Sequence, residues 1–534
     1  ASIHAAGVVI APGDLTDYVP LYKSSTDDIT SQYDMKGLEE LGLLKMDFLG
    51  LRNLTVIDKT VRLIEEKGDT VNIEKLSMDD VQVYKLFAKG HTIGVFQFES
   101  SGMREFLKKL QPTVIEDLIA MNALYRPGPM ENIDNFISRK HGKKKIVYSQ
   151  PLMEPILKET YGIIVYQEQV MQIAHEIAGF TLVEADIMRR AMGKKIKSLM
   201  AELAIKFVAG AEEKGIKKNK AEEIFSLIEK FAQYGFNKSH AAAYAIIAYQ
   251  TAYLKTYFPD EFFSASMTMD ISNQNKLSQF YEEIKRLNIN IVRPDINKCF
   301  ADFRSDDNNF YYALGGIKSV GYKAVSNIIK ERIQNGKFKS INDFISRLNP
   351  KDINKLQLEG LVKAGAFDDL NNNRQALFNS IPNFILKAKN IFDNKVANQI
   401  DLFGSDEIKD DDIVNFIDDW KFEERLSKEF EAVGFFISDH PLNQFKEIFD
   451  DYKIIDFNKF NTNNEYKESN IAATLLKIQE RKTAKGNSYA IIKLTDLTSV
   501  FELFIFSDIL ELNRNILVEG NSLIITLSKN ITDD

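Results

Sequence analysis

The sequence predicts a multidomain α+β protein, with a short β-rich segment first, a long helical region after it and a β-rich region at the C-terminal end. Three observations support this fold class. The chain has 534 residues, too many for one hydrophobic core, which suggests about three or four domains. Apolar residues recur at helical spacing from Thr55 to about Asn297. From Asn470 onward they alternate with polar residues, as in strands.

Composition and charge indicate a soluble protein with separate modules. Hydrophobic residues make up 44% and charged residues 27% of the chain, as in ordinary globular proteins. No run approaches the ~18–20 apolar residues that a membrane span needs, and the single Cys299 excludes an internal disulfide and fits a reducing compartment. We therefore expect a cytoplasmic protein without a membrane partner. The net charge of −8 hides basic blocks at Met103–Tyr148 and Asp186–Lys220 and an acidic block at Asp406–Glu424.

Residues 1 to about 52 alternate short β-rich runs with turn residues and predict part of a sheet. Within them, Gly42–Gly50 is an apolar run that we expect to be a buried strand, and it carries Lys45 and Asp47. Side chains alternate faces along a strand, so these two charges project side by side. One interpretation is an ion pair on a solvated sheet face. The other is a metal-binding carboxylate at a strand end with a cation beside it. Because the chain begins with Ala1 and has no initiator Met, we expect a part of a longer protein.

Three groups of basic residues lie in the helical region. The Pro-Gly-Pro sequence at 127–129 must break a helix and presents one Arg on a rigid loop. Thr181-Leu-Val-Glu184 predicts a capping box that opens a basic helix. Gly235–Tyr244 predicts a helix start whose free N–H groups favour an anion. Each group alone is better explained as a solvated helix face, but together they favour a polyphosphate site, although the chain has no P-loop motif. The residues are Arg126, Arg189, Arg190, Lys194, Lys238 and His240.

The stretch Leu314–Ile329 has the Gly-Ile-Lys-x-Val-Gly pattern of a hairpin ahead of a helix. Successive backbone N–H groups in such a hairpin can hold a phosphate, and Lys318 adds a charge. This is the helix-hairpin-helix pattern, which grips a DNA backbone without reading its sequence. Ile341–Phe367 is a second and weaker copy. The alternative is a plain pair of helices joined by a turn.

Two further features lie near the C-terminal end. Ala397–Gly404 is a short apolar island whose Leu402 and Phe403 have the character of an anchor peptide for a partner's pocket. Four short strands, with a helix predicted at Asp508–Leu517, suit an OB-type barrel, a fold that often binds single strands. The barrel is expected to be incomplete.

Taken together, the motifs resemble those of the alpha subunit of bacterial DNA polymerase III, a C-family replicative polymerase. They occur in the family's order over essentially the whole chain. The stretches that carry the resemblance are His4-Ala-Ala-Gly-Val-Val-Ile-Ala-Pro, Lys45-Met-Asp-Phe-Leu-Gly-Leu, Gly94-Val-Phe-Gln-Phe-Glu-Ser, Tyr125-Arg-Pro-Gly-Pro, Tyr166-Gln-Glu-Gln-Val-Met, Arg189-Arg-Ala-Met-Gly-Lys-Lys and Phe236-Asn-Lys-Ser-His-Ala-Ala-Ala-Tyr.

The resemblance implies a domain order and a set of roles. Residues 1–52 would be the C-terminal part of a β-sheet palm, 53–310 the α-helical fingers, 311–370 tandem helix-hairpin-helix elements, 371–465 a clamp-binding region with a linker, and 466–534 an incomplete OB-fold. Asp47 would be a catalytic palm carboxylate and metal ligand, with Lys45 near the substrate phosphates. The six basic residues and Lys318 would contact nucleotide or DNA phosphates. Gln399, Leu402 and Phe403 match the family's motif for the sliding clamp, which tethers the enzyme to DNA.

The resemblance further implies template-directed DNA synthesis by two-metal nucleotidyl transfer, with Mg²⁺ as cofactor. The partners would be template-primer DNA, dNTPs, the sliding clamp and other replicase subunits, namely a proofreading exonuclease and the clamp-loader tau subunit. The family takes two more carboxylates from an upstream P-D-x-D-x-D-F motif, which this sequence lacks. The two-metal site is therefore incomplete, and we expect this chain alone to be inactive or nearly so. The alternative function is a non-enzymatic DNA- and clamp-binding module.

Overall fold

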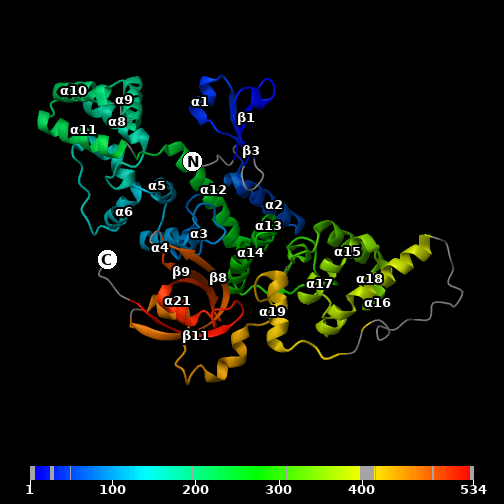
Figure 1. The fold of residues 1–534 in the computed structure, drawn as a ribbon. Coiled ribbons are helices and arrows are strands. Elements are labelled where there is room, and N and C mark those ends of the chain that lie inside the picture. Colours follow the sequence, from blue (N-terminus) through cyan, green and yellow to red (C-terminus); the bar gives the residue numbers. More distant parts are fainter. Residues whose placement is uncertain are drawn as a thin grey trace. The chain divides into compact units, whose positions relative to one another are not determined.

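The computed structural model divides into two compact units, residues 1–56 and residues 57–534 (Figure 1). Within it, the helical prediction for residues 55 to about 297 and the strand-rich prediction after residue 470 are confirmed. The structure describes residues 6–23, 29–48, 50–194, 197–232, 234–306, 309–396, 414, 417–463, 465–483 and 486–529, and excludes the side chains of residues 193, 194, 197, 232, 395, 396 and 462.

The first unit holds two small antiparallel strand pairs, in which β1 pairs with β4 and β2 pairs with β3. Its buried core is small and consists of Val19, Leu38 and Leu43. The α1 helix starts at a side-chain cap, where Asp34 accepts a hydrogen bond from the Gly37 N–H (2.9 Å). The elements are β1 (Gly7–Ile10), η1 (Leu15–Asp17), β2 (Leu21–Lys23), β3 (Ile29–Ser31), α1 (Met35–Glu40) and β4 (Leu44–Asp47).

The prediction that the run around Lys45 is a buried strand is wrong. The alternation of faces is as expected, but the apolar face formed by Leu44, Met46 and Phe48 is exposed, at 56%, 42% and 59%. The opposite face of the β1–β4 pair carries Val9, which packs against the small core. Periodicity identified the residues that share a face. It could not identify which face the described residues cover.

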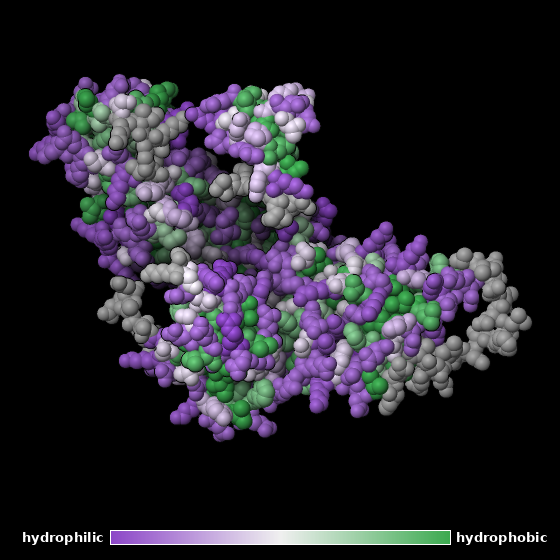
Figure 2. All heavy atoms as spheres, in the orientation of Figure 1, coloured by the Kyte–Doolittle hydropathy of each residue, from purple (hydrophilic) through white to green (hydrophobic). Residues whose placement is uncertain are grey.

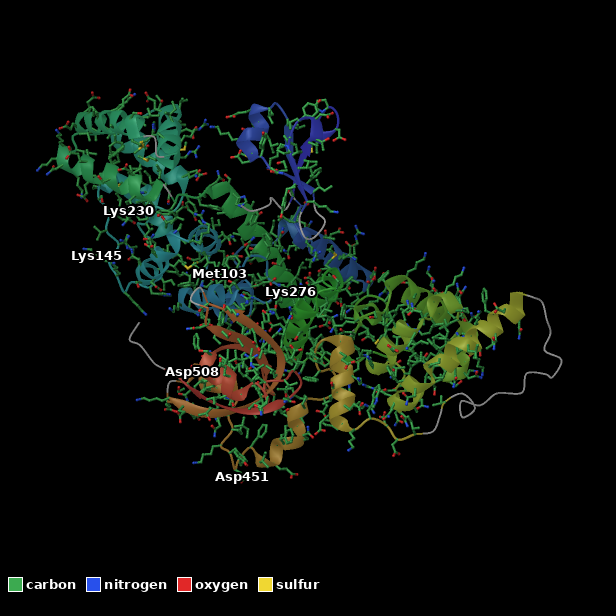
Figure 3. The ribbon with its side chains drawn as sticks, viewed as in Figure 1. Met103, Lys145, Lys230, Lys276, Asp451 and Asp508 are labelled. Atoms are coloured by element: carbon green, nitrogen blue, oxygen red, sulfur yellow. The ribbon has the colours of Figure 1, made fainter. Side chains whose placement is uncertain are left out.

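The second unit begins with helices that pack into two cores. One core joins α12 to α3 and α5, and the other joins α8, α9, α10 and α11. Lys276 of α14, labelled in Figure 3, forms an ion pair with Glu99, which lies just before α4. The helices are α2 (Arg52–Glu66), α3 (Val81–Ala88), α4 (Ser101–Leu110), α5 (Ile115–Leu124), α6 (Ile133–Lys140), α7 (Glu154–Leu157), α8 (Gln167–Ala178), α9 (Leu182–Lys194), α10 (Lys197–Glu213), α11 (Lys218–Ala232), α12 (Lys238–Tyr257), α13 (Pro259–Met269) and α14 (Gln274–Arg286).

A buried ion pair between Lys255 of α12 and Glu283 of α14 connects these two helices. The Lys255 ammonium donates to the carbonyl oxygens of His91 and Ile93 (both 2.7 Å) and to the Glu283 carboxylate (2.6 Å). The Lys255 and Glu283 side chains are only 1% and 4% exposed. Buried charges are tolerated only when they are paired and hydrogen-bonded, and here all three ammonium protons have acceptors.

The next region contains a small three-stranded sheet, with the strand order β5-β7-β6, and four helices that follow it. The buried Arg374 side chain, at the start of α18, pairs with Asp368 in the turn that follows α17 (2.7 Å) and with Glu429 of α19 (3.3 Å). The elements are β5 (Ile291–Val292), β6 (Arg304–Ser305), β7 (Phe310–Tyr311), η6 (Leu314–Gly316), α15 (Tyr322–Asn335), α16 (Ile341–Arg347), α17 (Lys355–Lys363), α18 (Arg374–Val396), α19 (Phe422–Val433), η9 (Pro441–Ile448) and α20 (Phe457–Thr462).

The last region is a curled four-stranded antiparallel sheet with the order β10-β9-β8-β11 (Figure 1). Inward side chains of all four strands and Leu510 of α21 form its core. In Figure 2, small apolar groups lie among hydrophilic side chains over this sheet. The elements are β8 (Glu468–Lys482), β9 (Ser488–Thr495), β10 (Val500–Phe506), α21 (Ser507–Asn513) and β11 (Ser522–Ser528).

Candidate functional site

The candidate site is built where the loop before α12 meets the start of α8. Tyr166 and Phe236 form a short parallel bridge. The Phe236 N–H donates to the Val165 carbonyl oxygen (3.1 Å), and the Gln167 N–H donates to the Phe236 carbonyl oxygen (3.0 Å). The Gln167 side-chain amide also donates to the Gly235 carbonyl oxygen (3.1 Å). These bonds hold two helix starts side by side, so side chains from both helices face a common region.

Arg126 lies against the same loop. As predicted, α5 ends at Leu124, before the Pro-Gly sequence. The Arg126 guanidinium donates to the carbonyl oxygens of Ala123 and Tyr234 (both 2.9 Å) and lies 4.3 Å from the Phe236 ring centroid. Burial lowers the pKa of Arg126 from its ordinary value. Two of the three guanidinium nitrogens, Nε and Nη2, therefore hold the loop in position.

Lys238 and His240 occupy the first turn of α12, whose N-cap Asn237 accepts from the His240 N–H (2.8 Å). The Lys238 ammonium is held by both oxygens of Glu159 (2.8 and 2.7 Å). The Lys238 N–H donates to the Glu168 carboxylate (3.0 Å). The sequence predicts an external anion at the start of α12, but there the Lys238 N–H already donates to the Glu168 carboxylate of this chain. Neither carboxylate could be predicted as a partner of Lys238, because Glu159 and Glu168 lie 79 and 70 residues away in the sequence.

The His240 ring lies in an aromatic stack. Its centroid is 5.3 Å from that of Phe236 and 4.2 Å from that of Tyr244, one helical turn later. The stack fixes the ring at the exposed start of α12. An imidazole held in this way can donate a hydrogen bond or offer a flat surface to a ligand.

The predicted capping box opens α9, since the Glu184 N–H donates to Thr181 Oγ1 (3.3 Å) and the Thr181 N–H donates to the Glu184 carboxylate (2.9 Å). Arg189 donates to Asp186 Oδ1 (2.7 Å) and to Gln167 Oε1 (3.2 Å). Arg190 pairs with the other oxygen of Asp186 (2.7 Å), and its side chain is 68% exposed. The pKa of Asp186 is lowered, first by the hydrogen bonds from Arg189 and then by the positive charges of Arg189 and Arg190. Lys194 ends the helix, and its side chain lies outside the described part of the chain.

The structure therefore brings Arg126, Arg189, Lys238 and His240 around the Tyr166–Phe236 bridge, with Arg190 beside them on α9. Gln167 joins these parts, and sequence reasoning missed it because an uncharged side chain carries no electrostatic signal. Arg189, Arg190 and Lys238 each pair with a carboxylate, and such a cation can exchange that partner for a phosphate. Among the described residues, no group of three or more His, Cys, Asp or Glu side chains could hold a metal ion.

Lys45 and Asp47 lie in the first unit and are considered by themselves. Their side chains form an ion pair along β4, as the strand alternation predicted. Lys45 is the more buried of the two, at 15% exposure against 42% for Asp47. The Asp47 carboxylate therefore remains accessible beside a fixed cation.

The predicted hairpin contains η6 and leads into α15. Lys318 and Ser319 are exposed, and Ser319 has a positive φ of 65°. The Lys318 N–H is not available to a phosphate, since it donates to the Ala432 carbonyl oxygen at the end of α19 (2.8 Å). In the second predicted copy, Gly360 of α17 packs so closely that an added Cβ would lie 2.8 Å from the Lys318 carbonyl oxygen. The two copies therefore pack directly against each other.

The outer face of the four-stranded sheet combines aromatic and basic side chains. The strand register aligns Phe506, Tyr489 and Arg481 in one row and Phe504, Ile491 and Gln479 in the next. Glu502, Lys493 and Lys477 form a third row. Phe504 and Phe506 are 63% and 68% exposed. Aromatic rings beside cations are the composition of a surface on which nucleic-acid bases stack.

Family models match the first strand-rich segment, part of the helical region and the paired hairpins. The model of the bacterial DNA polymerase III alpha subunit finger domain matches residues 53–215. A helix-hairpin-helix motif model matches residues 288–377, and a bacterial DNA polymerase III alpha NTPase domain model matches residues 1–50. The chain belongs to the family of bacterial DNA polymerase III alpha subunits.

Curated relatives support the same family. The chain is 44% identical to DNA polymerase III subunit alpha of Borreliella burgdorferi over 98% of its length and 46% of the relative. It is 41% identical to that of Caulobacter vibrioides over 100% of the chain and 47% of the relative. The corresponding values for Aquifex aeolicus are 40%, 98% and 44%. The chain thus spans about half the length of the curated relatives it matches.

Two further predictions concern the sliding-clamp motif and the absence of a membrane span. Gln399, Leu402 and Phe403 lie outside the described residues, so the clamp motif stays a prediction. Within the described ranges, no helix is long and apolar enough to cross a membrane.

Proposed function

We propose that this chain contributes the nucleotide, DNA-backbone and sliding-clamp contacts to template-directed DNA synthesis. The cluster around Gln167 carries the proposal, because cations from three separate segments converge there. Arg126, Arg189 and Lys238 would bind the phosphates of an incoming dNTP, with Arg190 and Lys194 nearer the DNA. His240 would orient the triphosphate from the first turn of α12. Family membership supports this assignment, and the carboxylates that pair with Arg189, Arg190 and Lys238 explain how these three cations are neutralised without substrate.

The expected domains form part of the proposal. Residues 1–52 would belong to a palm, 53–310 to the fingers, 311–370 to tandem helix-hairpin-helix elements and 371–465 to the clamp-binding region. Residues 466–534 would form an OB-type fold, supported by the four-stranded order β10-β9-β8-β11. Its outer aromatic face would bind the single-stranded template, and the exposed Lys318 hairpin would grip the duplex backbone.

Mg²⁺ fits this chain only in part. Two-metal phosphoryl transfer needs several carboxylates to hold the ions. Asp47 supplies one accessible carboxylate beside Lys45, whereas the P-D-x-D-x-D-F motif is absent from the 534 residues. The residues of this chain therefore do not complete a two-metal site, and we propose that its synthetic activity requires the family's other carboxylates.

The first experiment combines the chain with a polypeptide that carries those carboxylates and measures Mg²⁺-dependent primer extension. We expect extension with the combined polypeptides and its loss on Asp47→Ala. Extension that is unchanged by Asp47→Ala would remove Asp47 from the mechanism.

A second experiment tests the nucleotide contacts in the chain itself. Lys238→Gln and Arg189→Gln should each weaken dATP binding by about tenfold, because each removes a charge-assisted contact. Lys230→Gln on α11, labelled in Figure 3, is the matched control and should bind as the unmodified chain does. Equal affinities for all three variants would exclude the cluster as the triphosphate site.

A non-enzymatic DNA- and clamp-binding module is the second candidate, and the exposed hairpin at Lys318 and the aromatic outer face of the four-stranded sheet favour it, because both suit DNA contact without chemistry. It predicts salt-sensitive DNA binding and clamp capture without synthesis, even after the missing polypeptide is added. Both candidates predict loss of clamp binding when Leu402 and Phe403 are replaced by Ala. Retained binding would exclude the anchor peptide.

A further inference from the structure

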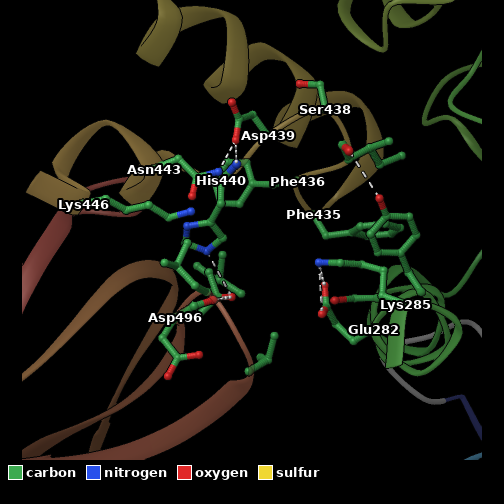
Figure 4. A pocket seen from close by; sticks show the side chains of 17 residues that line it. Glu282, Lys285, Phe435, Phe436, Ser438, Asp439, His440, Asn443, Lys446 and Asp496 are labelled. Carbon is green, nitrogen blue, oxygen red and sulfur yellow. Dashed lines mark hydrogen bonds and ion pairs between the residues drawn. The ribbon is translucent and has the colours of Figure 1, made fainter. Parts of the chain in front are cut away.

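A cavity of about 300 Å³ lies between α14, the segment 435–446 and the end of β9 (Figure 4). It shares no lining residue with the cluster around Gln167. Its volume is at the lower end of the range of about 300–1,000 Å³ found for small-molecule sites. It is therefore a separate place where a small ligand could bind.

Three nitrogen donors from two segments line this cavity: Lys285 of α14, and His440 and Lys446 at the N-cap and within η9. Lys285 forms a long ion pair with Glu282 (3.4 Å), and its ammonium lies 5.7 Å from the centroid of the Tyr281 ring. In Figure 4, the Lys446 ammonium points toward His440, and within the described residues it forms no hydrogen bond or ion pair. The cavity thus presents two ammonium groups that are weakly paired or unpaired within the described chain.

The nearby carboxylates are engaged elsewhere. Asp496 accepts from the N–H groups of Thr498 and Ser499 (2.8 and 2.6 Å) and, with its other oxygen, from that of Phe457 (2.7 Å). Asp439 accepts from the His440 N–H (2.7 Å) and from the Asn443 side-chain amide. Both carboxylates cap backbone turns, so neither neutralises the lysines directly.

His440 is held as a neutral imidazole. Its Nδ1 accepts from the Leu442 N–H (3.1 Å), which leaves the proton on Nε2, 3.4 Å from Thr495 Oγ1. Burial, followed by the charge of Lys285, lowers the pKa of His440 to about 4; Lys446 acts in the same direction, and Asp496 and Asp439 oppose it. An anion between the lysines would reverse much of this effect.

A further group in the cavity requires a donor. The Oδ1 atom of Asn443 is buried and has no hydrogen-bond partner in the described chain, although such atoms are nearly always satisfied. Aromatic rings also line the cavity: the ring centroids of Tyr281 and Phe435 lie 4.9 Å apart, and the ring of Phe436 lies 5.8 Å from that of His440. The cavity therefore combines cations, an unsatisfied acceptor and flat apolar surfaces.

We propose that this cavity binds a nucleotide. Lys285 and Lys446 would bind its phosphate, Asn443 Oδ1 would accept from an amino or hydroxyl group, and the rings would contact the base. A free nucleotide and a nucleotide within a DNA strand present the same chemistry. The proposal goes beyond the dNTP contacts proposed above, because it concerns a second site.

The test uses the full chain, which has only six histidines, labelled with ¹³C and ¹⁵N and followed by NMR. The probes are dAMP and a five-residue deoxyadenosine oligonucleotide. We expect the His440 resonances to move and the pKa of His440 to rise with at least one probe. His240 reports separately on the proposed dNTP site, and the exposed ring of His175 serves as the internal control. A response to dAMP identifies a free nucleotide, and a response to the oligonucleotide alone identifies a strand.

Variants complete the test. Lys285→Gln with Lys446→Gln should weaken the probe's effect on His440 by about tenfold or more, while leaving any His240 response intact. Asn443→Leu should weaken it by a smaller factor, and Lys467→Gln, an exposed lysine outside the cavity, should leave it unchanged. If neither probe moves His440, or if the double variant responds as the unmodified chain does, the proposal is wrong.

Discussion

At the scale of single residues, Gln167 connects the parts of the candidate dNTP site. Its side-chain oxygen accepts from Arg189, and its side-chain nitrogen donates to the Gly235 carbonyl oxygen. A charged group binds a phosphate more tightly when its position is fixed before the ligand arrives, because less conformational entropy is lost on binding. Gln167 fixes both an arginine of α9 and the loop that leads to Lys238.

Replacing Gln167 with Met keeps the length of the side chain but removes both hydrogen bonds. We expect the free energy of unfolding to fall by about 1–3 kcal/mol and dATP binding to weaken by about fivefold. Urea denaturation and calorimetric titration measure the two effects. Gln334→Met, at an exposed position of α15, is the control and should change neither. Unaltered dATP affinity in Gln167→Met would show that the side chain does not position the site.

The ionisation of one buried carboxylate, Glu283, should make the free energy of unfolding depend on pH in the acid range. Burial opposes its ionisation, but hydrogen bonds from Arg286 and Lys255 and their charges outweigh burial and lower its pKa to about 2. The stabilisation is therefore present above the ordinary pKa of about 4.5 and is lost as the pH falls from 4.5 toward 2.

Glu283→Gln should lower the free energy of unfolding at pH 7 by about 3–5 kcal/mol, because it leaves the Lys255 ammonium buried without its carboxylate. It should also flatten the loss of stability between pH 4.5 and pH 2, the interval set by the shifted pKa. Denaturation curves at several pH values measure both effects. Glu282→Gln, the neighbouring and more exposed carboxylate, should retain the acid dependence of the unmodified chain.

At the scale of elements, local signals in the sequence predicted local structure. The Pro-Gly sequence predicted the end of α5, and Thr181 with Glu184 predicted the start of α9, because both depend only on neighbouring residues. The carboxylates that pair with Lys238 could not be predicted, since the fold brings them from 70 or more residues away. Alternation likewise predicted that Lys45 and Asp47 share a face, but it could not predict that the apolar face is exposed.

The outer face of the β8–β11 sheet should bind a single-stranded oligonucleotide through its exposed aromatic rings. Phe504→Ala and Phe506→Ala should each weaken binding of a single-stranded oligonucleotide by about 1–3 kcal/mol, the usual contribution of one stacked base. Fluorescence anisotropy at fixed salt measures the affinity. Ile524→Ala is a matched control, because Ile524 is an exposed apolar residue on β11, away from the β9–β10 aromatic rows. Equal losses in all three variants would indicate a general effect on the sheet rather than stacking.

At the scale of the whole molecule, the two compact units differ in the size of their buried cores. The unit of residues 1–56 buries three apolar side chains in its described core, whereas residues 57–534 contain several larger clusters. A segment of this size buries too little apolar surface to be more than marginally stable. Because cooperative units open independently, the smaller unit should open without the larger one.

Hydrogen exchange followed by mass spectrometry tests this independence. We expect amides of β1 and β4 to exchange at least about 100-fold faster than amides of α12, since local opening costs much less free energy than global unfolding. Leu38→Ala, in the small core, should remove the remaining protection of β1 and β4 and leave that of α12 unchanged. If the substitution also lowered protection in α12, the two units would unfold together. The accessible Asp47 would then depend on the larger unit for its position, and its loss in an extension assay would no longer report on the carboxylate alone.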